Sequence, residues 1–230
     1  MSAPRNAARH RRGLLLGGGG RYADPWHPFA ETDAALVDVA REAGVVLDPL
    51  TDVDAALRGF AEGALPDLVV VNLGQPRDGG PAPSDAVAAA GLARLLAGPT
   101  PVLAVHSSTT CFPGDAVWEA GLGGTWVQGR TMHPPFGRAD VLVADDAHPV
   151  TAGVGDFALD DERYTFLRHT PAARVLLAHE HEGRRHPLLW VHTRRGGGLT
   201  VYDALGHDAR SYASAAHRTV LRRSLDLLLP

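Results

Sequence analysis

The sequence lacks or is poor in several residue types, and each shortage excludes a class of function. It contains no lysine, so arginine supplies every one of its 22 cationic side chains, which removes Schiff-base chemistry and a P-loop lysine. The only cysteine, Cys111, excludes an internal disulfide and any multi-thiolate metal site. No apolar run approaches the ~18 residues that cross a bilayer. The net charge of −4 gives no electrostatic case for binding nucleic acid or an anionic membrane.

What is present is typical of a globular α/β protein. Apolar residues make up 45% of the 230 positions and charged residues 21%, which excludes a disordered or fibrous chain. The arginine-rich residues 1–12 are expected to form a flexible arm, and residues 13–230 a single domain. No cleavage site follows the short apolar run after this arm, so we expect a cytoplasmic protein without a signal peptide.

Hydrophobic periodicity predicts alternating strands and helices in the first half of the chain. Strands are predicted to begin near Leu14, Val45, Leu68 and Val102, with helices at 29–43, 51–62 and 84–97 between them. This alternation indicates a doubly wound, mostly parallel sheet. In the second half, predicted strands at 141–143, 175–177, 188–190 and 199–201 follow with few helices, until a final helix at 211–229. These later strands are expected to form hairpins or extensions at one edge.

Ligands of such sheets bind beyond the carboxyl ends of the strands, which points to the loops 17–29, 72–83 and 106–113. The first loop is glycine-rich and carries His27, for which capping of the next helix is an equal alternative. Its glycines do not have the spacing of a dinucleotide site. In the third loop, His106 follows a strand directly, and Ser107 or Ser108 is an alternative nucleophile although no G-x-S-x-G motif is present. Cys111 lies too far beyond the strand to be an amidotransferase nucleophile, so we expect it not to be catalytic.

Eight short motifs follow one another in a characteristic order. They are GGGG at 17–20, VHSS at 105–108, HPVTAGV at 148–154, DF at 156–157, DERY at 161–164, PLLWVH at 187–192, GGGLTVY at 196–202 and ALGHD at 204–208. In this order the sequence resembles the trehalose-utilisation (ThuA-like) family, from about Leu14 to Leu228. The resemblance implies a flavodoxin-like fold related to class I glutamine amidotransferases, without their Cys-His-Glu triad. It also implies a role in the use of disaccharides or keto-sugars.

The resemblance also implies a set of functional residues. The matching positions are His27, His106, Asp161, Glu162, Tyr164, Trp190, His207 and Asp208. Some have structural alternatives: Asp208 can cap the last helix, and Trp190 can belong to the core. The 131–135 loop stands where a ligand-facing segment is expected. Among the other histidines, His148 is expected to be structural, and His179 and His181 to be exposed beside a hairpin turn at 182–184.

The resemblance implies chemistry on an oxidised glycoside, and these residues are the candidates for it. Glu162 is the predicted base that removes a proton next to a carbonyl, and His27, His106 and His207 are expected to polarise that carbonyl, directly or through a divalent metal such as Zn²⁺. Predicted sugar-binding residues are Tyr164, Trp190, Asp208 and Gly19. We predict that the three histidines and Glu162 line one pocket at the carboxyl edge of the sheet, and that Glu162→Gln abolishes turnover.

Other functions remain open at this stage. The leading hypothesis is a lyase, hydrolase or isomerase acting on a keto-disaccharide or keto-glycoside. The alternatives are a non-catalytic sugar-binding or regulatory module, a hydrolase that uses Ser107, and a subunit that acts only with an oxidoreductase. A small-molecule sugar is the expected partner, with a homo-oligomer as a further possibility.

Overall fold

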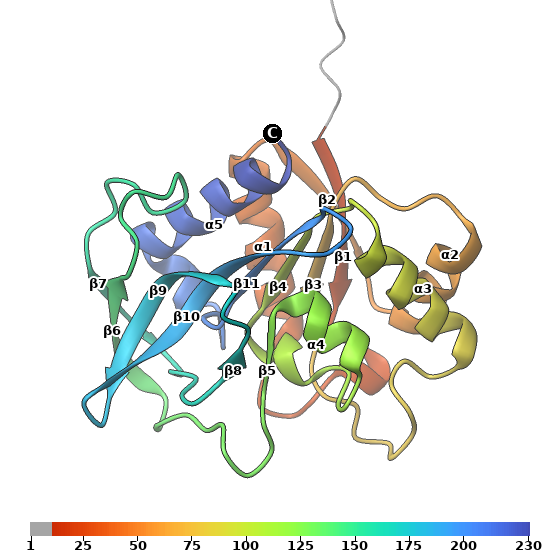
Figure 1. The fold of residues 1–230 in the computed structure, drawn as a ribbon, viewed down its shortest axis with the longest axis horizontal. Coiled ribbons are helices and arrows are strands. Elements are labelled where there is room, and N and C mark those ends of the chain that lie inside the picture. The colour runs from red at the N-terminus through yellow and green to blue at the C-terminus, as the bar shows by residue number, and fades with distance from the viewer. Residues whose placement is uncertain (1–10) are drawn as a thin grey trace, which may run out of the picture.

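Five parallel strands form one side of a nine-stranded sheet in the computed structural model, which describes residues 11–230 (Figure 1). The strand order is β2-β1-β3-β4-β11-β10-β9-β6-β7. The parallel strands are β1 (Arg11–Gly17), β2 (Val45–Leu50), β3 (Val69–Asn72), β4 (Val102–Val105) and β11 (Leu199–Asp203). The order 2-1-3-4 followed by one more parallel strand is that of the flavodoxin-like folds, so the predicted fold class is confirmed.

The remaining strands extend this sheet at one edge, as the sequence predicts. Each is antiparallel to its neighbour in the order β10 (Arg184–Thr193), β9 (Arg174–His181), β6 (Gly137–Val143) and β7 (Phe157–Asp161). A separate two-stranded ribbon joins β5 (Gly124–Thr125) to β8 (Arg168–His169). Because four antiparallel pairings separate β11 from β7, β7 runs in the same direction as the parallel strands. Its carboxyl end therefore lies at the same edge as theirs.

Helices cover both faces of the sheet (Figure 1). One face carries α1 (Phe29–Glu42) and α5 (Ala215–Leu228), and the other carries α2 (Val53–Glu62), α3 (Ala86–Ala97) and α4 (Ala116–Leu122). Side-chain oxygens of the preceding residue cap four of them: Asp52, Asp85, Asp115 and Ser214 accept from backbone N–H groups of the first turn. Close packing of α2 on α3 requires Gly91, since a Cβ there would lie 1.7 Å from the carbonyl oxygen of Leu57.

Three short 3₁₀ helices complete the fold: η1 (Gly20–Tyr22), η2 (His106–Thr110) and η3 (Ser211–Ala213). The predicted final helix is thus divided into η3 and α5, because Ser214 caps a new helix. α4 and β7 were not predicted from the sequence. None of the helices among residues 11–230 is long and apolar enough to cross a membrane.

The predicted boundary of the N-terminal arm is wrong by two residues. β1 already begins at Arg11, whose guanidinium donates to the backbone oxygens of Ala43 and Leu225. Arg11 is therefore tied to the ends of α1 and α5. The rest of the predicted arm, residues 1–10, lies outside the described residues.

Candidate functional site

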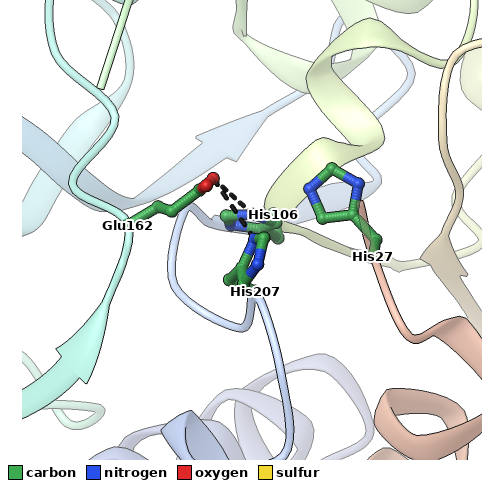
Figure 2. A group of neighbouring side chains, drawn as sticks. All are labelled: His27, His106, Glu162 and His207. Carbon is green, nitrogen blue, oxygen red and sulfur yellow. Dashed lines mark ion pairs between the residues drawn. The ribbon is translucent and has the colours of Figure 1, made fainter. Parts of the chain in front are cut away.

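Three histidines and one glutamate from four distant segments meet at the carboxyl edge of the sheet (Figure 2). One nitrogen from each of His27, His106 and His207 and one oxygen of Glu162 all lie within 4.8 Å of one another. Glu162 Oε2 is 3.4 Å from His106 Nε2 and 3.3 Å from His207 Nδ1. The structure therefore brings together the four residues that the sequence predicts to share one site.

His27 is held by a carboxylate three residues before it. Its Nδ1 lies 2.8 Å from both oxygens of Asp24, so Nδ1 carries the proton and Nε2 keeps the lone pair. Burial, together with the neighbouring imidazoles, lowers the pKa of His27 despite Asp24, so the ring is neutral at pH 7. Nε2 is buried and has no hydrogen-bond partner. A buried lone pair without a donor is what a metal ligand requires.

His106 occupies the sharp turn between β4 and η2 with φ of 45°, a left-handed conformation that is uncommon for residues other than glycine. Its ring is only 1% exposed. Nδ1 donates to the carbonyl oxygen of Ala204 at 2.8 Å, and Nε2 lies 3.1 Å from the hydroxyl of Tyr164 and 3.4 Å from Glu162 Oε2. Tyr202 fixes the backbone of the turn by donating to the carbonyl oxygen of His106. The strained turn and these contacts aim Nε2 at Glu162.

The pKa values of Glu162 and His207 are shifted in opposite directions. Burial opposes ionisation of Glu162, but the contacts with His106 and His207 outweigh it and hold the pKa of Glu162 well below its usual range. Burial likewise opposes the charging of His207, and Glu162 raises the pKa of His207 above its ordinary value. Glu162 is thus an anion at neutral pH. An ionised carboxylate in this position can bind a cation, and it can also accept a proton.

Asp161 fixes the two loops that carry Glu162 and His207. Its Oδ1 accepts from the backbone N–H groups of Glu162 (2.8 Å) and His207 (3.2 Å), and its Oδ2 accepts from Gly206 (2.8 Å). The side chain is 1% exposed. The buried carboxylate of Asp161 therefore connects the end of β7 to the loop after β11. The position of Glu162 relative to His207 depends on this connection.

We expect Asp161→Asn to weaken metal binding at the four-residue group by about 10–100-fold, as losses of supporting ligand contacts do. An asparagine offers a single acceptor oxygen, and its NH₂ would face a backbone N–H group that needs an acceptor. A competitive chelator titration measures the change. Asp160→Asn is the matched control, since Asp160 is exposed one residue earlier in β7. Equal affinities in the two variants would contradict this role of Asp161.

One residue near the group was not assigned a role from the sequence. His133, in the 131–135 loop, has Nδ1 3.5 Å from Glu162 Oε1, and its side chain is 36% exposed. Glu162 Oε2 thus faces His106 and His207, and Glu162 Oε1 faces the more exposed His133. Asp24 was also missed. Its position three residues before His27 could have indicated that its carboxylate contacts the imidazole of His27.

The other predicted site residues have different outcomes. Tyr164 is buried and contacts His106, as described. Trp190 was predicted to bind sugar, and this prediction is wrong: the ring is fully buried, donates to the carbonyl oxygen of Leu122 and packs against Tyr202. Gly19 lies against Thr51, and Asp208 accepts from Arg210. Their roles in sugar binding stay predictions.

The alternative nucleophiles are occupied or inaccessible. Ser107 Oγ donates to the carbonyl oxygen of Leu73 at 2.9 Å, and Ser108 Oγ donates to that of Val71 at 2.7 Å. Both serines are buried and serve to attach η2 to β3. Cys111 is completely buried, and burial raises the pKa of its thiol well above the usual range. These contacts do not support a serine or cysteine nucleophile.

The prediction for the β9–β10 hairpin histidines is partly wrong. His179 is fully buried rather than exposed, with Nε2 against the carbonyl oxygen of Tyr164. Burial lowers the pKa of His179 to about 4. The turn itself is as predicted, with Glu182 and Gly183 in left-handed conformations. His148 is buried and accepts from the N–H of Val150, in agreement with a structural role.

The four-residue group has the composition of a divalent transition-metal centre, and two of its separations match the spacing of one. Neutral imidazole nitrogens and a carboxylate are ligands of Zn²⁺ and similar ions. Atoms bound tetrahedrally at about 2.0–2.1 Å lie about 3.3 Å from one another, close to the separations of Glu162 Oε2 from His106 and His207. The Asp24 carboxylate and the Ala204 carbonyl oxygen orient two of the rings through their other nitrogens. Among residues 11–230 this is the group of three or more such side chains that is arranged to hold an ion.

Fold and site together define a mostly parallel α/β protein with a half-buried three-histidine, one-carboxylate group at the carboxyl edge of its sheet. The family model described as "Trehalose utilisation" (ThuA) matches residues 27–226, so the chain belongs to this family. That membership suggests a carbohydrate-related role. No curated protein matches the chain.

Solved structures agree with this assignment at the level of the fold. A ThuA-like protein from Parabacteroides merdae superimposes with a TM-score of 0.75 at 15% identity, covering 94% of this chain and 88% of that one. A ThuA-like protein from Bacteroides uniformis gives 0.71 at 15% identity, with coverage of 99% and 96%. A glutamine amidotransferase from Thermotoga maritima gives 0.51 at 14% identity, with coverage of 96% and 89%. The predicted relation to the amidotransferase fold is confirmed.

Proposed function

We propose that this protein is a metal-dependent enzyme of carbohydrate utilisation that acts on an oxidised (keto) glycoside. The observation that carries the proposal is the convergence of one nitrogen each of His27, His106 and His207 and one oxygen of Glu162 within 4.8 Å of one another, with His27 Nε2 buried and without a hydrogen-bond partner. Four titratable side chains that meet in a half-buried site are costly to desolvate without a ligand. Membership of a trehalose-utilisation family supports a sugar as the substrate class.

In this proposal the four residues hold a divalent ion such as Zn²⁺. A bound ion of this kind polarises a carbonyl oxygen and stabilises the negative charge that develops there. Asp24 and the Ala204 carbonyl oxygen keep His27 and His106 in the tautomers that leave Nε2 free. Asp161 fixes the loop that carries Glu162 relative to the loop that carries His207, because it accepts hydrogen bonds from both.

The chain also supplies a group for proton transfer. Removal of a proton from the carbon next to a carbonyl needs a base beside the polarised oxygen. Since Glu162 is held as an anion among the ligand histidines, we assign this role to His133, which faces Glu162 Oε1 and has an exposed edge. An imidazole can take up a proton near neutral pH and return it to the departing oxygen of a glycosidic bond. These two transfers amount to an elimination, in which a carbon–carbon double bond forms as the glycosidic bond breaks, and so they suit a lyase of keto-glycosides. A hydrolase would add water across that double bond in a further step.

The test is to incubate the zinc-loaded protein with methyl 3-keto-glucoside and with 3-keto-trehalose, and to follow the loss of each by chromatography. We expect conversion that chelation abolishes and added Zn²⁺ restores. The matching sugars without a keto group should remain intact, because their ring protons are not acidified. The proposal is contradicted if no keto-glycoside is converted by protein that contains stoichiometric metal.

Cys111→Ala is expected to leave this conversion unchanged within about twofold. The thiol is buried behind η2 and acts as a small apolar group. Steady-state rates with the converted keto-glycoside provide the measurement, alongside a melting curve to confirm folding. A complete loss of turnover in a folded Cys111→Ala protein would show that the thiol participates.

A further inference from the structure

The edge strand β2 leaves apolar side chains open on one of its two faces. On one face α1 packs against the strand, and Val45 and Leu47 are buried there. On the other face, Val46 and Leu50 are 48% and 43% exposed among the residues that the structure describes. Apolar surface left open beside a sheet edge is a common mark of a protein–protein interface. The mechanism above uses none of these residues.

A hollow of about 410 Å³ opens beside these side chains, between β1, β2 and the carboxyl end of α2. Its apolar wall consists of Leu14, Phe60, Leu65 and Pro66. Asp48 also lines the hollow, and it lies two residues from Val46 and two from Leu50 along β2. Side chains two residues apart in a strand point to the same face. The hollow, Val46 and Leu50 therefore form one surface, which we call the β2 face.

The β2 face also carries charges of both signs. Arg12 lines the hollow and binds Asp48 through Nη2 at 2.8 Å, and its other N–H groups have no acceptor within residues 11–230. Asp67 lies on the rim of the same hollow, is exposed, and forms no ion pair with any residue of that range. The surface thus offers guanidinium donors and a carboxylate that do not bind each other within the described part of the chain.

These features fit a second copy of the same surface. In a two-fold symmetric dimer one patch faces itself, so every contact from a first residue to a second is repeated in the opposite sense. The β2 face supplies both members of each contact: apolar side chains and an apolar hollow, Arg12 and Asp67. Pro49 has no N–H group with which to extend the sheet, so the contact is made through the face of β2 rather than through its edge.

We propose that the protein forms a two-fold symmetric dimer through the β2 face. Val46 and Leu50 of each copy pack against the hollow of the other, and Arg12 of each copy binds Asp67 of the partner subunit. The hollow lies at the amino edge of the sheet, whereas the four-residue group lies at the carboxyl edge. Both copies of that group therefore stay open in the dimer, and the inference does not rest on the proposed function.

The experiment measures the monomer–dimer equilibrium of the wild type, Val46→Arg and Val87→Arg by sedimentation velocity between about 1 and 100 µM. Val87 is the matched control, because it is 50% exposed, lies on α3 and does not line the hollow. We expect the wild type to dimerise with a micromolar dissociation constant. Val46→Arg should raise this constant at least about tenfold, and Val87→Arg should leave it unchanged. A wild type that stays monomeric throughout, or equal dimerisation of the two variants, would overturn the inference.

Charge reversal tests the two-fold contact itself. Asp67→Arg and Arg12→Asp each place like charges opposite one another in a homodimer, so each variant alone should dimerise at least about tenfold more weakly. An equimolar mixture of the two variants should form heterodimers, because both contacts then join opposite charges. A mixture that dimerises no better than its components would contradict the proposed contact. Zinc content should be the same in all of these proteins, so a failure of the dimer would leave the metal site untouched.

Discussion

His106→Asn is expected to lose metal binding by at least about 100-fold and to reduce keto-glycoside turnover below detection. Asparagine suits this position for two reasons. It is among the residues best tolerated at positive φ, and its amide N–H can replace Nδ1 as the donor to the carbonyl oxygen of Ala204. The substitution therefore preserves the turn while it removes Nε2, the atom that faces Glu162.

The matched control is His169→Asn. His169 is half-buried and also directs Nδ1 at a backbone oxygen, that of Thr170 at 3.1 Å, but it lies outside the four-residue group. Zinc affinity is measured by competition with a chromophoric chelator, and folding by circular dichroism. A folded His106→Asn protein with the zinc affinity of the wild type would rule out His106 as a ligand.

His217→Ala is expected to destabilise the fold by about 3–5 kcal/mol, the cost of leaving one member of a buried ion pair alone. His217 and Asp203 are both fully buried, with Nε2 2.8 Å from Asp203 Oδ2. The other nitrogen, Nδ1, lies 3.0 Å from the carbonyl oxygen of Ser211, which can only accept. Nδ1 also lies 3.0 Å from the hydroxyl of Ser211. The pair joins α5 to the end of β11 just before the loop of His207.

The pH dependence of this stabilisation has a definite direction. Burial opposes the charge, but Asp203 outweighs it and raises the pKa of His217. The folded protein thus binds this proton more tightly than the unfolded chain, in which the pKa is about 6.5. The stabilisation is complete below that pH and is lost as the pH rises through the higher folded pKa.

Urea denaturation of the wild type and His217→Ala, at pH 6 and at increasing pH, tests both statements. The difference in the free energy of unfolding should be largest at pH 6 and should shrink as the pH rises. His169→Ala is the control, with an expected cost below about 1 kcal/mol. In the double variant with Asp203→Asn, the cost should be less than the sum of the single costs. Additive costs, or a difference that grows with pH, would contradict a charged pair.

The first half of the fold was predictable because each element is encoded locally. Apolar runs such as 68–71 and helical spacing at 29–43 specify a parallel sheet, whatever follows them. The direction of β7 is not local: it depends on four successive antiparallel pairings, which no short pattern specifies. Its placement of Glu162 at the common edge came from the family resemblance rather than from periodicity.

Some of the site residues could likewise be placed from the sequence, and others could not. His27 and His106 follow parallel strands, so the sheet rule places them at one edge. The burial of Trp190 was a stated alternative, since a tryptophan in a strand often belongs to the core. The burial of His179 was not predicted, because its position beside a hairpin turn indicates exposure. The exposed edge of His133 depends on a long connection between α4 and β6, which has no periodic pattern.

The central claim is that the three histidines and Glu162 hold a metal ion, and metal analysis of the native protein tests it most directly. Inductively coupled plasma mass spectrometry after dialysis against metal-free buffer should find about one equivalent of Zn²⁺ or a similar ion per chain. The same measurement on His106→Asn should find almost none. A native protein without bound metal, which also fails to take up Zn²⁺, Mn²⁺, Co²⁺ or Ni²⁺ at micromolar concentrations, would contradict the account.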